Sequence, residues 1–297
     1  MDLTLFLQHL ANGVSLGGLY ALIAIGYTMV YGILRLINFA HGDIVMMASY
    51  FAFYGVAIFL IPWPISFLIA IVLTIALGVS IERVAYRPLR DAPRISLLIS
   101  AIGVSLLLEN VAVVLFGGRP KAFPRPPLFD QQWEIGGVKF SSLTLFIIIF
   151  SLVLLVALFI LVYRTKTGRA MRAVARDYDT ARLMGIDVNW VIAFTFGVGS
   201  GLAAIGALMW AMKFPQIIPL MGIFPGLKCF IAAVVGGIGS VPGAMLGGLI
   251  LGVGEILIVA FFPEMANWKY LFAYSLLIII LFIRPTGIMG KEIQEKA

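Results

Sequence analysis

Long apolar runs are the feature that most restricts how this chain can fold. The run from about Leu143 to Tyr163 contains no charged residue, and similar runs recur along the sequence. Because the hydrocarbon core of a bilayer is about 30 Å thick, a helix needs roughly 20 apolar residues to cross it. A transmembrane β-barrel would instead show short strands of alternating polarity. The pattern therefore predicts an all-α polytopic membrane protein.

The composition leaves little room for a soluble domain. Of 297 residues, 62% are hydrophobic and 12% are charged, and the mean hydropathy is +1.07. A soluble protein with so few polar residues could not cover its surface. We therefore expect residues 1–297 to form a single transmembrane domain with about eight to nine crossing helices. The predicted spans are about Leu10 to Leu34, Ala40 to Ile61, Pro64 to Ala85, Ile95 to Phe116, Leu143 to Tyr163, Trp190 to Met212, Phe224 to Val235, Pro242 to Phe262 and Tyr270 to Ile283.

One predicted span is too short to cross a bilayer alone. The segment Phe224 to Val235 is apolar, but Pro225 and the pair Gly236–Gly237 interrupt it. Half-length helices of this kind often mark a site near the membrane midplane, because their freed backbone groups must face protein or water. Glycines four residues apart also predict close helix packing. These pairs are Gly13 and Gly17, Gly197 and Gly201, Gly243 and Gly247, and Gly248 and Gly252.

The basic residues predict the orientation of the chain. Cytoplasmic loops carry an excess of Lys and Arg, and most of the 21 basic residues fall on one predicted side. These are Arg35, Arg83, Arg87, Arg90, Arg94, Arg164, Lys166, Arg169, Arg172, Arg176, Arg182, Arg284, Lys291 and Lys296. A loop of about residues 117–142 lies on the opposite side, and its prolines predict an extended external segment. The N-terminus is then expected outside and the C-terminus inside.

The same placement explains the net charge of +7. Because the basic residues lie in short segments between apolar runs, we interpret the charge as a sign of topology and predict no binding of nucleic acid. The first residues, MDLTLFLQHLANG, begin with an acid. They do not resemble the basic start of a cleaved signal peptide.

Short sequence similarities suggest an internal repeat. The first span contains ALIAIGYTMVYG and the sixth contains GLAAIGALMWAM, while LGVSIE ends the third span and LGVGE lies in the eighth. Five crossings separate the members of the first pair, so they would run in opposite directions, as an inverted-topology repeat requires. Chance similarity among glycine-rich helices is an equally good explanation of motifs this short.

The sequence contains no motif typical of an enzyme. It has no GxxxxGK[ST] loop to hold a nucleotide phosphate, no GxSxG nucleophile motif and no Cys/His cluster with metal-ligand spacing. Cys229 is the single cysteine, so no intramolecular disulfide can form. We expect no catalytic residues, no bound metal and no cofactor on this chain.

The largest predicted cytoplasmic segment, about residues 164–189, has an amphipathic pattern. The positions predicted on its apolar face are Ala170, Ala173, Val174, Ala181, Leu183 and Met184. The positions predicted to face water include Arg172, Arg176, Asp177 and Asp179. Gly185 is expected to end the helix. The pattern fits either a charged connector or a helix lying on the membrane that docks into a partner.

Polar residues inside predicted spans are costly and often functional. Asn38, His41 and Asp43 lie at the start of the second span, where they could line a pathway or form a polar helix N-terminus with Asn38 as the cap. Glu109 and Asn110 lie inside the fourth span, and Glu255 lies inside the eighth. Lys228 is a candidate partner for one of these acids, and such a pair could serve structure or transport. Glu82 and Arg83 are interpreted as a surface pair.

Several blocks of sequence resemble one known family in a fixed order. They are LGGLYALIAIGYTMVYGILRLINFAHGDIVMMASY, ERVAYRPLR, LLISAIGVSLLLEN and GLKCFIAAVVGGIGSVPGAMLGGLILGVGE. Together they resemble the permeases of high-affinity branched-chain amino-acid importers driven by ATP-binding cassettes, over nearly the whole chain. The length is similar to that of the shorter of the two permeases in such systems.

This resemblance implies a function and a set of partners. The chain would be the permease subunit of an inner-membrane importer with an inverted-repeat fold. It would work with a second related permease, two cytoplasmic ATPase subunits that bind the ATP, a periplasmic amino-acid-binding protein and membrane lipid. The resemblance places ATPase contact in the RAMRAVARDYDTARLMGI block. The residues implied are Arg169, Arg172, Ala173, Arg176, Asp177, Ala181, Leu183 and Gly185.

Two other functions stay open on the sequence alone. One is a related importer for urea or short amides, because no residue reveals the substrate directly. The other is a secondary transporter that works without ATP. That transporter would need an ion-coupling site, and the few acids within the spans form no obvious chain.

Overall fold

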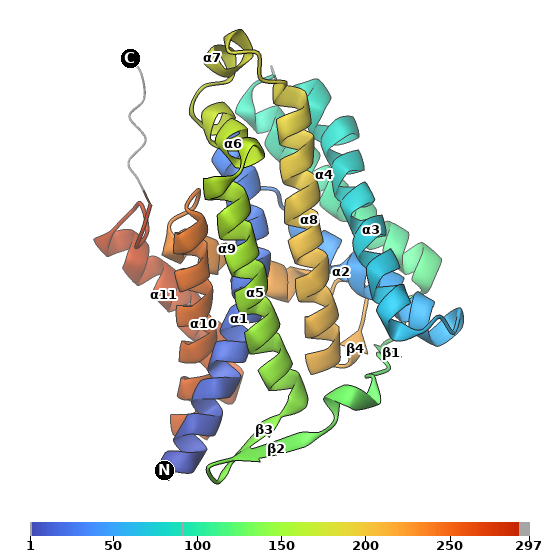
Figure 1. Ribbon diagram of the computed structural model, residues 1–297, viewed down its shortest axis with the longest axis vertical. Coiled ribbons are helices and arrows are strands. Elements are labelled where there is room, and N and C mark those ends of the chain that lie inside the picture. The colour runs from blue at the N-terminus through green and yellow to red at the C-terminus, as the bar shows by residue number, and fades with distance from the viewer. Residues whose placement is uncertain (1, 91, 291–297) are drawn as a thin grey trace.

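The computed structural model describes residues 2–90 and 92–290, and it confirms a helical membrane protein. Six of the described helices are long and apolar enough to cross a membrane. They are α1 (Leu3–Leu34), α3 (Trp63–Ile81, continued by short π and 3-10 turns to Leu89), α4 (Arg94–Phe116), α5 (Ser142–Arg164), α8 (Val188–Lys213) and α10 (Val241–Phe261). Shorter apolar helices are α2 (His41–Phe53, continued by a π turn Tyr54–Ile58), α9 (Ile223–Gly236) and α11 (Lys269–Ile283). The long helices α1, α5 and α8 run along the long axis of the molecule (Figure 1).

Contacts between distant segments define the two ends of the bundle. At one end, which we call the inner end, the Arg35 Nη2 atom donates to the Ala175 carbonyl at 3.1 Å. The C-terminal segment joins this end, where the Ile288 amide donates to the Val235 carbonyl. The inner end also carries α6 (Lys166–Arg176) and α7 (Tyr178–Leu183), as Figure 1 shows. It therefore gathers the described members of the predicted cytoplasmic set of basic residues.

The opposite, outer end contains the described strands. The hairpin β2 (Gln132–Ile135) and β3 (Val138–Ser141) turns through Gly136 and Gly137, both with positive φ, as a tight hairpin turn requires. Strand β1 (Lys121–Ala122) pairs antiparallel with β4 (Gln216–Ile217). The predicted extended loop of residues 117–142 lies at this end, where it forms short strands and pairs with the loop after α8; that it faces the outside of the cell stays a prediction.

The chain crosses from the outer to the inner end between α8 and α10. Residues 214–222 connect the outer end of α8 to α9, and α9 ends at Gly236. The turn that follows lies at the inner end, because a Cβ on Gly32 of α1 would lie 3.8 Å from Gly239. The loop and the short helix therefore complete one crossing together. Over the described residues this gives nine passages, within the predicted eight to nine, and places Leu3 and Ile288 at opposite ends of the bundle.

Two predicted boundaries are wrong. Helix α1 begins at Leu3, seven residues before the predicted start at Leu10, because polar Gln8 and His9 interrupt the hydropathy without breaking the helix. The second span begins as a helix at His41, one residue after its predicted start, but its regular α-helical part ends at Phe53 and the π turn that follows ends at Ile58, before the predicted end at Ile61. The residues before this helix form a loop inside the bundle, which is described with the site below.

An inverted repeat organises the packing around α1 and α8. Helix α1 packs against α8, α9 and α10, while α8 packs against α1, α2 and α3. The close contacts between α1 and α8 are related by the same repeat. A Cβ on Gly26 would lie 3.0 Å from the Gly199 carbonyl, and a Cβ on Gly206 would lie 3.9 Å from the Leu19 carbonyl. Gly26 and Gly206 are 180 residues apart, as are Leu19 and Gly199. The two contacts are therefore equivalent under a pseudo-two-fold axis.

The predicted glycine pairs lie at helix contacts. Gly17 of α1 and Gly252 of α10 touch backbone to backbone, so any side chain at either position would collide with the other helix. Gly201 of α8 instead receives the Ile75 side chain of α3, with a Cβ-to-carbon distance of 3.3 Å. Because apolar side chains gain nothing by leaving lipid, close backbone packing of this kind supplies much of the attraction between helices.

Candidate functional site

The connection from α1 to α2 returns into the bundle. The ring of His41, the first residue of α2, lies 4.5 Å from the ring of Tyr27 between centroids. Tyr27 and its neighbour Gly26, which also contacts His41, precede the inner end of α1 at Leu34 by about two helical turns. At 1.5 Å per residue, α2 begins roughly 10–12 Å below that end. The segment 35–40 is thus non-helical backbone at membrane depth, which is tolerated only where protein or a cavity covers it.

Helix α9 begins at the same depth, and its N-terminus meets that of α2. A Cβ on Gly42 would lie 2.6 Å from the Gly222 carbonyl, and a Cβ on Gly222 would collide with the Gly42 carbonyl. Gly226 also approaches the Gly42 backbone. Gly42 and Gly222 are 180 residues apart, so this contact lies on the pseudo-two-fold axis. The N-termini of the two half-length helices therefore touch through their backbones, and only glycine fits at this contact.

A cavity of about 180 Å³ lies where these two helix starts meet α1 and α4. Asp43 supplies the acid of its wall: its side chain is 2% exposed, and its Oδ2 atom accepts a hydrogen bond from Ser105 of α4. Most of the remaining wall is apolar. The lining residues are Tyr27, Ile37, Phe39, Gly42, Asp43, Ser105, Gly222, Ile223, Gly226, Leu227 and Phe230. The cavity thus combines one carboxylate with an apolar surface.

Of the three polar residues predicted at the second span, Asp43 alone lines this cavity. Asn38 does not cap α2, because the cap position is Ala40 and no side chain bonds to it. The Asn38 Oδ1 atom instead accepts from the Tyr86 hydroxyl at 2.8 Å. His41 is buried against Gly26 and Tyr27, and its Nε2 atom has no hydrogen-bond partner among the described residues. The capping interpretation of Asn38 is therefore wrong.

The two polar residues of α4 that the sequence predicted, Glu109 and Asn110, lie outside the cavity wall. Asn110 is exposed, and its Nδ2 atom donates to the Leu106 carbonyl of its own helix at 2.7 Å. Glu109 is half-buried and lies four residues after Ser105, on the same face of α4. The sequence analysis named Glu109 and Asn110 but missed Ser105. A serine hydroxyl can bond to the backbone of its own helix, so a serine within an apolar span does not by itself indicate a functional site.

A buried polar cluster joins α1, α9 and α10. The Lys228 Nζ atom lies 2.6 Å from Glu255 Oε1 and 3.2 Å from the Tyr20 hydroxyl, and that hydroxyl donates to Glu255 Oε2 at 2.9 Å. The Lys228 ammonium also lies over the Tyr270 ring of α11, 4.6 Å from its centroid. The structure thus pairs Lys228 with Glu255. The cluster fixes the half-length helix α9 to the helices around it.

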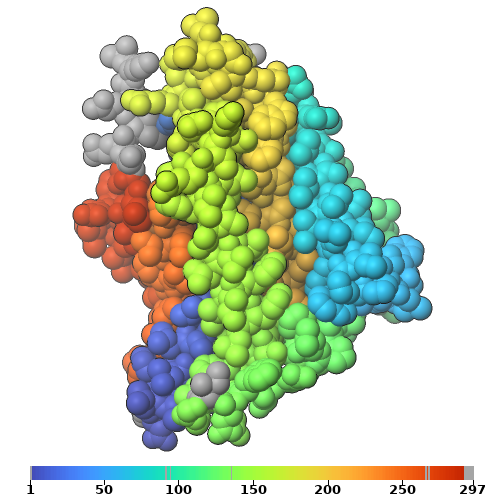
Figure 2. All heavy atoms as spheres, viewed as in Figure 1, coloured from blue at the N-terminus to red at the C-terminus, as the bar shows by residue number. Residues whose placement is uncertain are grey.

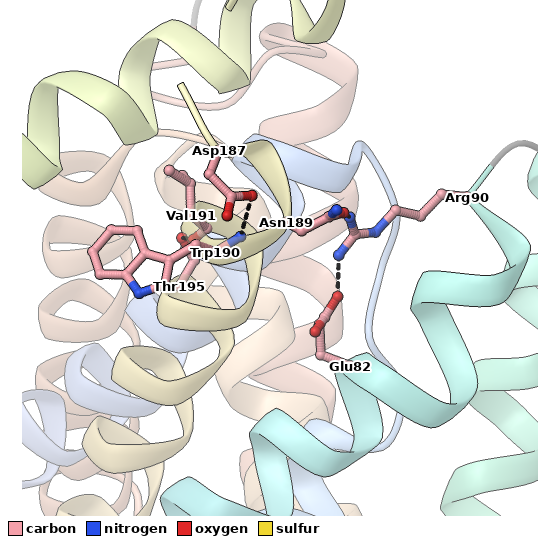
Figure 3. A network of polar contacts seen from close by, with 7 residues as sticks. All are labelled: Glu82, Arg90, Asp187, Asn189, Trp190, Val191 and Thr195. Atoms are coloured by element: carbon pink, nitrogen blue, oxygen red, sulfur yellow. Dashed lines mark hydrogen bonds and ion pairs between the residues drawn. The ribbon is translucent and has the colours of Figure 1, made fainter. Parts of the chain in front are cut away.

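A second buried ion pair lies at the inner end. Glu82 is 1% exposed and pairs with Arg90, which also donates to Asn189 Oδ1 at 2.7 Å; Figure 3 shows Glu82 and Arg90 pointing toward each other. The interpretation of Glu82 and Arg83 as a surface pair is therefore wrong. The π turn over Glu82–Tyr86 changes which residues share a face, so adjacency in sequence was misleading. Asp187 caps α8 beside this pair by accepting from the Trp190 amide.

The predicted cytoplasmic helix is two helices. Asp177 ends α6 and caps α7, with its Oδ1 atom accepting from the Asp179 and Thr180 amides. Gly185 has φ of 78° and follows the end of α7, as predicted. The predicted apolar face is wrong at its end, because Leu183 is 88% exposed.

The buried positions that hold this segment are Met171, Val174 and Ala181. The exposed side chains Leu183 and Met184 form an apolar tip at the end of α7. Arg169, Arg172 and Arg176 of α6 are also exposed, whereas Ala173 is half-buried. Figure 2 shows α6 and α7 forming the extremity of the molecule opposite the N-terminus.

The α6–α7 segment is hydrogen-bonded to the end of α1 and to the residue that follows it. The Tyr178 hydroxyl donates to the Ile33 carbonyl, and Arg35 donates to the Ala175 carbonyl. Burial raises the pKa of Tyr178 above its ordinary value, so its hydroxyl stays protonated and able to donate. A few residues further on, Ile37 and Phe39 line the cavity. A short stretch of chain thus connects the α6–α7 segment to the cavity wall.

Crossing helices, an inverted repeat and a cavity between two half-length helices together define a multi-pass membrane transport protein. Comparison with known proteins specifies the family. The family described as "Branched-chain amino acid transport system / permease component" matches residues 9–281. The chain belongs to this family.

Curated relatives cover nearly the whole chain. The high-affinity branched-chain amino acid transport system permease protein LivH of Salmonella typhimurium is 43% identical over 98% of this chain and 97% of its own length. BraD of Pseudomonas aeruginosa, which carries the same description, is 44% identical over 98% of both chains. A probable LivH of Methanocaldococcus jannaschii is 30% identical over 95% of this chain and 92% of its own.

A solved structure shares the fold. The structure of PsaBC from Streptococcus pneumoniae in complex with Fab matches with a TM-score of 0.50, covering 95% of this chain and 92% of that one. The sequences are 16% identical, so the likeness concerns the arrangement of helices alone.

Proposed function

We propose that this chain is the membrane-spanning permease subunit of an inner-membrane importer for branched-chain amino acids, driven by ATP-binding cassettes. The observation that carries the proposal is the 43% identity to LivH of Salmonella typhimurium over 98% of the chain. The same identity favours branched-chain amino acids over urea or short amides. The partners are a second related permease, two cytoplasmic ATPase subunits and a periplasmic binding protein, with ATP held by the ATPases.

The α6–α7 segment is the proposed contact with an ATPase subunit. Three features support this. The segment is anchored by buried residues, it carries exposed arginines, and it ends in the apolar tip of Leu183 and Met184. Exposed apolar side chains at the end of a membrane protein are costly in water and are stabilised by a partner that covers them.

Coupling of ATP hydrolysis to transport would use the short path described above. Displacement of α6 and α7 by the ATPases would act on the end of α1 through Tyr178 and Arg35. The chain then continues into the wall of the cavity at Ile37 and Phe39. The cavity is the proposed part of the transport pathway.

Reconstitution in proteoliposomes tests this proposal. Together with the second permease, the ATPases and the binding protein, the chain should accumulate leucine when ATP is supplied on the ATPase side. Without the ATPases it should neither hydrolyse ATP nor accumulate leucine, because it has no nucleotide-binding loop. Urea offered in place of leucine should not accumulate. Leucine accumulation by the chain alone, driven by an ion gradient, would show a secondary transporter instead.

A further inference from the structure

We infer that the cavity between the starts of α2 and α9 is a binding site for the amino acid in transit, and that Asp43 binds its α-ammonium group. The inference rests on the proposed function and deepens it. The argument depends on the size of the cavity, on its charge and on the surroundings of Asp43.

The cavity has the size of a small amino acid. Its 180 Å³ corresponds to the space of about a dozen water-sized probes. A branched-chain amino acid has about eight or nine non-hydrogen atoms, so it fits a cavity of this order. The apolar residues Ile37, Phe39, Leu227 and Phe230 provide a surface for an aliphatic side chain.

The charge of the wall suits a cationic group. Asp43 is the acid of the lining, and the lining contains no basic side chain. His41 lies two residues before Asp43 and packs on Gly26 and on the lining residue Tyr27, but it is not itself part of the lining. Glu109 lies one helical turn beyond Ser105 and adds a second acid nearby. A carboxylate buried in this way is stabilised by a cation that enters the cavity.

Two different roles of Asp43 can be separated. The acid could simply brace α2 against α4 through its hydrogen bond from Ser105. A bracing role predicts that Asp43→Asn binds leucine normally, because the amide oxygen can still accept from Ser105. A binding role predicts that Asp43→Asn binds leucine poorly, because the amide carries no charge for the ammonium group.

The test measures binding of radiolabelled leucine to the complex of permeases and ATPases in lipid nanodiscs, with the binding protein omitted. Asp43→Asn should weaken binding by at least about tenfold, the usual factor for a lost charge-assisted hydrogen bond. Asp43→Glu should recover part of the loss, because it restores a carboxylate in the cavity. Glu264→Gln, which changes an exposed acid at the outer end, is the matched control and should bind normally.

Competitors test the same idea on the unmodified protein. Leucinol keeps the ammonium group but lacks the carboxylate, and it should compete with leucine. 4-Methylpentanoate lacks the ammonium group and should not compete. The inference is overturned if Asp43→Asn binds leucine like the wild type, if 4-methylpentanoate competes as well as leucinol, or if the wild-type complex binds no leucine. ATP-driven leucine uptake by the same wild-type complex is measured in parallel, so that failure of the binding site can be told from failure of the proposed function. If the wild type takes up leucine but Asp43→Asn has no effect on binding, the binding site is refuted and the proposed function stands.

Discussion

The Lys228–Glu255 pair allows a quantitative prediction about what holds α9 in place. Lys228 is 5% exposed and Glu255 is 6% exposed. Lys228→Met removes the cation and leaves the Glu255 carboxylate with the Tyr20 hydroxyl as its remaining contact in the cluster. Loss of one partner of a buried ion pair costs roughly 3–5 kcal/mol, because the other charge stays buried without compensation. A loss of that size should lower the melting temperature by on the order of ten degrees.

The double variant separates a structural pair from a transport site. Lys228→Met combined with Glu255→Gln leaves no buried charge, and the new amide can still accept from Tyr20. Its melting temperature should return to within a few degrees of the wild type. Melting would be followed by fluorescence-detected size-exclusion chromatography of the purified protein in detergent. Leucine uptake by the double variant should recover with its stability, if the pair only fixes the helices.

Two results would contradict this reasoning. A Lys228→Met protein that melts like the wild type would show that the pair contributes little to stability. A double variant that is stable but cannot transport leucine would show that the charges act in transport.

Three further perturbations test orientation, coupling and packing. In intact cells, a membrane-impermeant thiol reagent should label the cysteine of Asp130→Cys and should not label that of Arg176→Cys, while buried Cys229 stays unlabelled. The reverse pattern of labelling would invert the topology. Leu183→Glu should reduce co-purification of the ATPases several-fold, because it charges the exposed apolar tip, whereas Leu128→Glu at the outer end should not; equal co-purification would place the contact elsewhere. Gly222→Ala should abolish uptake, because its Cβ would collide with the Gly42 carbonyl; normal uptake would show that α2 and α9 separate easily.

Local patterns predicted most of the helices. About eight to nine passages, the short helix near Phe224 and the helix end at Gly185 all follow from apolar runs and from Gly and Pro, which act within a few residues. The start of α2 was predicted to within one residue, but its depth inside the bundle was beyond such reasoning. The residues before His41 are apolar enough to continue a span, and their return into the bundle depends on contact with Gly26 and Tyr27 of α1.

The site was predicted in part for a related reason. Asp43 attracts notice because an acid inside a span is costly, but its partner Ser105 is 62 residues away on α4. Similarly, Gly42 and Gly222 each look like ordinary helix glycines, and only their separation of 180 residues relates them. The internal repeat, which was only a weak sequence similarity, could have related Gly42 to Gly222. Its alignment of Gly26 with Gly206 also aligns the starts of α2 and α9.

The two walls of the cavity are attached to different parts of the molecule. The α9 wall is held by Lys228 to Glu255 of α10 and to Tyr20 of α1. The α2 wall continues from the end of α1, which Tyr178 holds through the Ile33 carbonyl. Gly42 and Gly222 touch through backbone alone, with no side chain to interlock them. In the proposed function, a displacement of α7 at the inner end would act first on the end of α1 and on the α2 wall that follows it, whereas the α9 wall is held further along α1, at Tyr20.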